Sequence, residues 1–114
     1  MAEIKDDLLK NYQEFTESAE RDFQDKRYNP AISSYFKALA IICDYTIYLQ
    51  RGLLPKNHRE RFLFLEVHYP EAYKLITPLF KEYTDSYNVR IQKETVQRLK
   101  ENVEKLKTIL QFKS

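Results

Sequence analysis

The sequence predicts an all-α protein, a compact up-and-down bundle of about five helices that forms one domain over residues 1–114. Three observations support this prediction. Apolar residues recur every three or four positions through most of the chain, which is the spacing of one helix face. No segment shows the period-two alternation of a half-buried strand. Helix start and stop residues divide the chain into five pieces, and the single glycine, Gly52, ends one of them.

The first two predicted helices are the longest. The first is expected from about Glu3 to Lys26, and its apolar stripe consists of Ile4, Leu8, Tyr12, Phe15, Ala19 and Phe23. Asn29 as N-cap and Pro30 as first helical residue are typical of a helix start. This second helix is expected to run to Gly52. Apolar residues cover more than one of its faces, which predicts the central, most buried helix of the bundle.

Three shorter helices follow. Asn57 and Glu60 form a loose capping box that opens the third. The fourth is expected over about Pro70–Tyr87, and Pro78 inside it is expected to kink or split it. After a connection over residues 88–93, the stripe of the last helix extends from about Lys93 to Gln111.

The composition is that of a soluble globular domain, with 43% hydrophobic and 32% charged residues. No apolar run approaches the roughly 18 residues of a transmembrane helix, so we expect no membrane contact. The N-terminal residues do not resemble a signal peptide. A single cysteine, Cys43, cannot form an intramolecular disulfide and is interpreted as a small buried apolar residue. These features predict a cytoplasmic protein.

The net charge of +2 is unevenly distributed. Residues 1–28 hold eight acids and five bases, whereas residues 81–114 hold five acids and eight bases. One interpretation is that the terminal helices pair within the bundle. The other is a basic nucleic-acid face, but a pI of about 8.6 is low for it, and we expect no DNA binding. Two scattered histidines and one cysteine form no zinc motif, and one glycine excludes a phosphate-binding glycine-rich loop, so no metal or cofactor is expected.

Two runs of sequence resemble a known family. They are Ala31–Leu39 (AISSYFKAL) and Leu49–His58 (LQRGLLPKNH), which are similar to HEPN domains (higher eukaryotes and prokaryotes nucleotide-binding). In that family a helix with small and aromatic residues leads to a glycine and a Pro-Lys-x-His turn. Residues 83–87 and the helix after them look like the closing segment of the family. There, Ser86-Tyr87 replaces an Asp-Tyr pair, and no arginine precedes it in register. The resemblance covers about residues 5 to 110.

The resemblance implies a compact helical bundle that often dimerises. Many HEPN proteins are encoded beside a minimal nucleotidyltransferase, in the manner of toxin–antitoxin pairs. Some are metal-independent RNases with an active site built from an arginine and a histidine four to six residues further on. In such a site an imidazole moves a proton while a guanidinium holds the phosphate.

Each histidine of this chain follows an arginine with six residues between them. The two candidate catalytic pairs are Arg51 with His58 and Arg61 with His68. The pair of the family is expected near Arg90, where no histidine occurs, so we expect no catalysis by this chain alone. The ligand-binding candidates are the basic residues around the predicted turn: Arg51, Lys56, His58, Arg59 and Arg61.

The sequence therefore predicts a non-catalytic, HEPN-like protein. It would act with a partner such as a minimal nucleotidyltransferase, or bind nucleotide or RNA at the turn after Gly52. The first alternative is a homodimeric interaction module that buries a second apolar face of the central helix. The second alternative is a HEPN-type metal-independent RNase.

Overall fold

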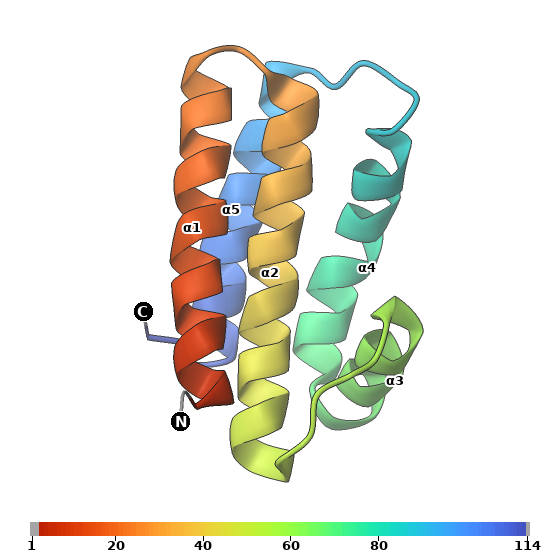
Figure 1. The fold of residues 1–114 in the computed structure, drawn as a ribbon. Coiled ribbons are helices and arrows are strands. Elements are labelled where there is room, and N and C mark those ends of the chain that lie inside the picture. The colour runs from red at the N-terminus through yellow and green to blue at the C-terminus, as the bar shows by residue number, and fades with distance from the viewer. Residues whose placement is uncertain (1–2, 114) are drawn as a thin grey trace.

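Five helices make up most of residues 3–113, the part of the chain that the computed structural model describes (Figure 1). They are α1 (Ile4–Gln24), α2 (Tyr28–Arg51), α3 (His58–His68), α4 (Pro70–Asp85) and α5 (Lys93–Ile109). No strand occurs in this part of the chain, and the predicted all-α class is confirmed. Among the described residues, no helix has the length and apolar character needed to cross a bilayer.

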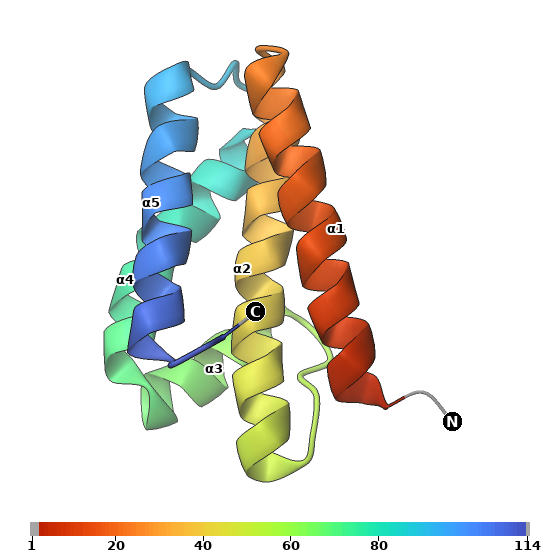
Figure 2. The ribbon, with the colours of Figure 1, turned by 90° about the vertical axis from the view of Figure 1, so that its left-hand side faces the viewer.

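The four long helices alternate in direction, and the short α3 lies beside the first half of α4 (Figure 1). The centre of the bundle is α2, which contacts all four other helices (Figure 2). It contributes twelve buried residues, including Phe36 and Leu39. Cys43 is one of them; burial raises the pKa of its thiol, as expected for a small core residue. Because contacts within the bundle cover its apolar faces, α2 has little apolar surface left for a dimer.

The terminal helices meet through an ion pair rather than through close packing of their backbones. Lys100 of α5 forms an ion pair with Glu20 of α1 at 2.8 Å. The same carboxylate accepts a hydrogen bond from the Tyr35 hydroxyl of α2 at 2.7 Å. Glu20 thereby joins three helices, and the pKa of its carboxyl is lowered, chiefly by the hydrogen bond to Lys100.

Asn29 has a different role from the predicted N-cap. The helix begins two residues earlier than predicted, at Tyr28, and Asn29 lies inside its first turn. Its side-chain amide donates to the carbonyls of Ser86 and Val89 at 2.7 and 2.8 Å and accepts the N–H of Ile91 at 3.0 Å. The predicted cap is therefore wrong, because this side chain bonds the α4–α5 loop instead of its own helix.

Three helices end in a left-handed residue, only one of which is glycine. Gly52 terminates α2 with φ of 71°, as predicted. Lys26 after α1 and Gln111 after α5 have φ of 62° and 55°. Beyond α5, the N–H of Phe112 bonds the Lys107 carbonyl at 2.8 Å, and its ring packs against the core. This hydrogen bond and the packing of Phe112 hold Gln111 in the left-handed conformation, which costs a non-glycine residue about 1 kcal/mol.

The fourth helix continues through Pro78, so of the two expected outcomes, a kink or a split, the split is wrong. Buried residues lie on both sides of the proline, Ile76 before it and Leu79 after it. Pro78 itself is exposed, and the carbonyl that loses its partner belongs to the exposed Lys74, where water can replace the bond. Packing of one apolar face thus outweighs the loss of one hydrogen bond.

Candidate functional site

The connection between α2 and α3, residues 52–57, runs back along α2 rather than turning tightly. Asp44 contacts Arg61, and Arg51 contacts His68, so the same separation of 17 residues recurs in both pairs. The contacts along α3 therefore follow the same chain order as those along the end of α2, and α3 crosses that end obliquely (Figure 2). Seven helical residues rise about 10 Å, a distance that an extended six-residue loop of roughly 20 Å easily spans.

The predicted capping box forms at the start of α3. The Asn57 side chain accepts the N–H of Glu60 at 2.9 Å. The Glu60 carboxylate accepts the N–H of Lys56 at 2.9 Å, one residue before the cap. These two bonds fix the direction in which α3 leaves the returning loop.

Arg61 is held between helices by an acidic residue of α2. Its Nε and Nη2 donate to the two oxygens of Asp44 at 2.7 and 2.8 Å. The side chains of Arg61 and Asp44 are only 11% and 14% exposed. Burial alone would lower the pKa of Arg61, but the hydrogen bonds and charge of Asp44 raise it overall. This bidentate ion pair joins α3 to α2, and the Asp44 carboxylate neutralises the charge of Arg61.

His58 lies in a cluster of aromatic rings. Its nearest ring neighbour is Phe80 at 5.1 Å between centroids, and the other rings belong to Phe36, Phe62 and Tyr83. Its Nδ1 accepts a hydrogen bond from Nη1 of Arg61 at 2.7 Å, because a guanidinium only donates. Burial, and then the charge of Arg61, lowers the pKa of His58. The ring is therefore a neutral packing group at pH 7.

The Arg–His pairs differ from those that the spacing predicted. Arg61 bonds His58, and Nη2 of Arg51 lies 3.2 Å from Nδ1 of the exposed His68. The Arg51 guanidinium also lies over the Phe64 ring, 5.8 Å from its centroid. The predicted pair of Arg51 with His58 spanned the turn, and that of Arg61 with His68 relied on spacing along one helix. In the structure Arg61 instead bonds His58, three residues before it, and the returning loop brings His68 to Arg51.

The third helix has two apolar faces. One faces the bundle through Phe62 and the fully buried Leu65. The other carries Leu63 and Val67, which are 59% and 64% exposed. An ordinary surface helix is polar on its outer side. We call the second stripe the outer face of α3; it comprises Glu60, Leu63, Phe64, Val67 and His68.

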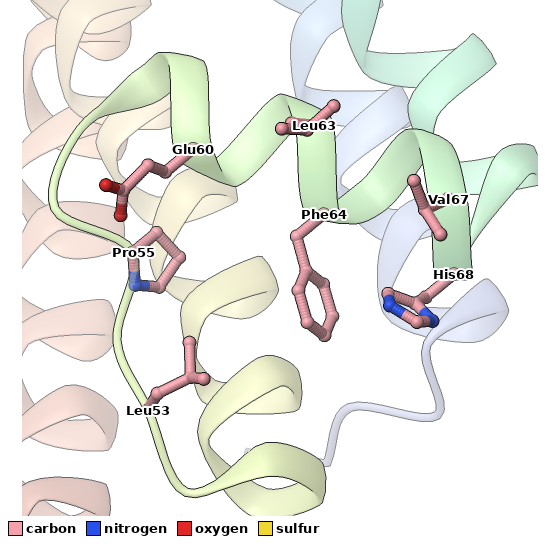
Figure 3. A pocket seen from close by; sticks show the side chains of 7 residues that line it. All are labelled: Leu53, Pro55, Glu60, Leu63, Phe64, Val67 and His68. Atoms are coloured by element: carbon pink, nitrogen blue, oxygen red, sulfur yellow. The ribbon is translucent and has the colours of Figure 1, made fainter.

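A pocket of about 280 Å³ lies between this outer face and the returning loop (Figure 3). Leu53 and Pro55 of the loop form one wall, and the five residues of the outer face form the other. Figure 3 shows the Phe64 ring pointing from α3 toward the end of α2. Only Glu60 and His68, at the two ends, bring polar side chains to the lining, so the middle of the pocket is apolar.

The predicted basic residues divide into two groups. Arg61 and His58 are half-buried and bonded to each other. Arg51, Lys56 and Arg59 are exposed, and no ion pair found within residues 3–113 includes any of them. Arg90 lies on the α4–α5 loop, at the opposite end of the bundle (Figure 1).

Sequence reasoning did not identify the pocket or the role of Asp44. The signal for the pocket was present in α3, where Leu63 and Val67 stand one turn apart on a face that Leu65 does not share. Nothing in the sequence indicated the role of Asp44, because its contact with Arg61 depends on the path of the loop.

In the described part of the chain, no group of His, Cys, Asp and Glu side chains is placed to hold a metal ion. No family model, curated protein or solved structure matches this chain.

Proposed function

We propose that this chain is a non-catalytic, HEPN-like helical protein that acts by binding a partner protein through the outer face of α3. The observation that supports the proposal is the pair of large apolar residues, Leu63 and Val67, more than half exposed beside an apolar pocket. Exposed apolar surface of this kind is typical of interaction sites. The family resemblance makes a minimal nucleotidyltransferase the partner to test first.

The absence of catalysis is proposed from the geometry of the histidines. His58 packs among aromatic rings and accepts a hydrogen bond from Arg61, whose charge Asp44 already neutralises. A metal-independent RNase needs an arginine that is free to bind phosphate and a histidine that can exchange protons with solvent. Arg51 and His68, which are both exposed and 3.2 Å apart, meet these two needs better than Arg61 and His58 and must be tested as well. We expect incubation with single-stranded RNA to give no cleavage; cleavage that His58→Ala or His68→Ala abolishes in a folded protein would establish the RNase alternative.

Calorimetric titration with a minimal nucleotidyltransferase tests the proposal. The double variant Leu63→Gln/Val67→Gln removes the apolar outer face and should weaken binding by about tenfold or more. Val89→Gln is the matched control, because Val89 is also exposed (56%) but lies on the α4–α5 loop. Equal affinity of the double variant and the control would contradict the proposal.

Nucleotide or RNA binding is a second candidate, favoured by the exposed Arg51, Lys56 and Arg59, none of which forms an ion pair within residues 3–113. Phosphate contacts by such residues give an affinity that falls with salt. Titration of a labelled single-stranded RNA at low salt, with wild type and with all three residues changed to glutamine, tests it. Binding that the triple variant retains would exclude this surface as the site.

A further inference from the structure

We propose that the segment which occupies the pocket is an acidic amphipathic helix of the partner protein, with an apolar side chain in the pocket and a carboxylate against Arg51. The inference rests on the proposed function, since it specifies the chemistry of the partner at the same surface. Three features support it: the shape of the apolar surface, the positive charge of Arg51 at one end of the pocket, and the charged residues around Glu60 at the other end.

The apolar surface has the spacing that a helix recognises. Leu63 and Val67 are one turn apart, and Leu53 faces them from the returning loop. Ridges of side chains at this spacing pack into the grooves of a second helix. A partner helix docks such a surface with apolar anchors three or four residues apart.

The positive charge lies at the end of the pocket where α2 and α3 both finish. Arg51 is positioned there by the Phe64 ring and by the Nδ1 atom of His68. These contacts use one of its N–H donors and leave the others free. Arg61 differs from Arg51 in this respect, because two of its N–H groups already donate to the oxygens of Asp44. A carboxylate from outside would give Arg51 the charge-assisted hydrogen bonds that Arg61 already has.

The opposite end of the pocket carries a negative charge. Glu60 lies eight residues before His68, which is about 12 Å along α3. Glu60 itself would repel a second carboxylate, but Lys56 and Arg59 are exposed on the loop and first turn at this same end. These two bases attract an acidic partner at longer range, and the free donors of Arg51 favour the Arg51 end for the carboxylate that contacts the surface.

Two synthetic peptides with the same leucine stripe test this inference. Each is about four helical turns long, capped at both ends, and differs only in flanking residues that are glutamate in one and glutamine in the other. Fluorescence anisotropy with the full chain at low salt should show the glutamate peptide binding about tenfold more tightly. Arg51→Gln should remove most of that preference. Arg90→Gln removes the same charge from an exposed residue of the α4–α5 loop, at the opposite end of the bundle, and should retain the preference.

The outcomes separate this inference from the proposed function. Equal binding of both peptides, lost in Leu63→Gln/Val67→Gln but unchanged in Arg51→Gln, would overturn the acidic partner and leave the outer face as a binding site. Failure of both peptides to bind would count against both proposals. Sedimentation that shows a homodimer of this chain, broken by the same double variant, would identify a second copy as the occupant and overturn the inference.

Discussion

Arg51 and Arg61 stand ten residues apart, and only Arg61 lies beside a carboxylate. The buried pair of Arg61 with Asp44 fixes α3 against α2, and it also holds the Nδ1 atom of His58. The exposed Arg51 has an aromatic ring and an imidazole as neighbours, and no carboxylate among the described residues. One arginine therefore has a structural role, while the other is suited to binding.

Loss of the Arg61 side chain should be costly. Arg61→Ala leaves Asp44 charged and largely buried, and we expect the free energy of unfolding to fall by about 2–3 kcal/mol. Arg59→Ala, on an exposed residue of the same helix, should change it by less than about 0.5 kcal/mol. Urea unfolding followed by circular dichroism measures both variants. Similar midpoints for the two would show that the ion pair does not hold α3.

The lowered pKa of His58 predicts a dependence of stability on pH. Burial, and then the charge of Arg61, disfavours the protonated ring in the folded state, so the unfolded chain binds the proton first as the pH falls. The contribution of neutral His58 is complete above the ordinary value of 6.5 and is lost between that pH and the lowered folded-state pKa.

A variant that does not titrate tests this dependence. His58→Asn offers Arg61 an amide oxygen near the position of Nδ1 and removes the ionisable ring. Between about pH 7.5 and about pH 5, its free energy of unfolding should decline less than that of wild type. Equal declines in the two proteins would mean that His58 does not contribute to the loss.

At the scale of elements, local signals in the sequence predicted the helices well and their contacts poorly. Gly52 as a helix end and Asn57 with Glu60 as a cap were correct, because each depends on a few adjacent residues. Asn29 was assigned wrongly, since a distant loop competes for its side chain. The pair of Arg61 with His58 is an i,i+3 pair within α3 that helical spacing could have shown. The pair of Arg51 with His68 could not be predicted, because it depends on the path of the loop.

The left-handed residue after α1 offers a direct test of the helix ends. Lys26 has φ of 62°, and Lys26→Gly should raise the free energy of unfolding by about 1 kcal/mol by removing the strain on its Cβ. Lys10→Gly, in the exposed middle of α1, should lower it by about 1 kcal/mol. Thermal unfolding compares the two. A lower stability of Lys26→Gly would contradict the left-handed end.

At the scale of the whole molecule, the core and the outer face of α3 are separate. The core centres on α2 and reaches α3 through Leu65, whereas Leu63 and Val67 point away from it. Leu65→Ala should lower the free energy of unfolding by about 2–5 kcal/mol, and Leu63→Gln/Val67→Gln by less than about 1 kcal/mol. Calorimetric unfolding measures both. A large loss in the double variant would indicate that the outer face is part of the core.

The most direct test of the central claim is hydrogen–deuterium exchange of this chain, free and in complex with a minimal nucleotidyltransferase, the proposed partner. If the outer face of α3 and the loop before it form the binding surface, residues 53–68 should exchange more slowly in the complex. The α4–α5 loop, at the opposite end of the bundle, should exchange at the same rate in both (Figure 1). Unchanged exchange over residues 53–68, with protection elsewhere, would contradict the account.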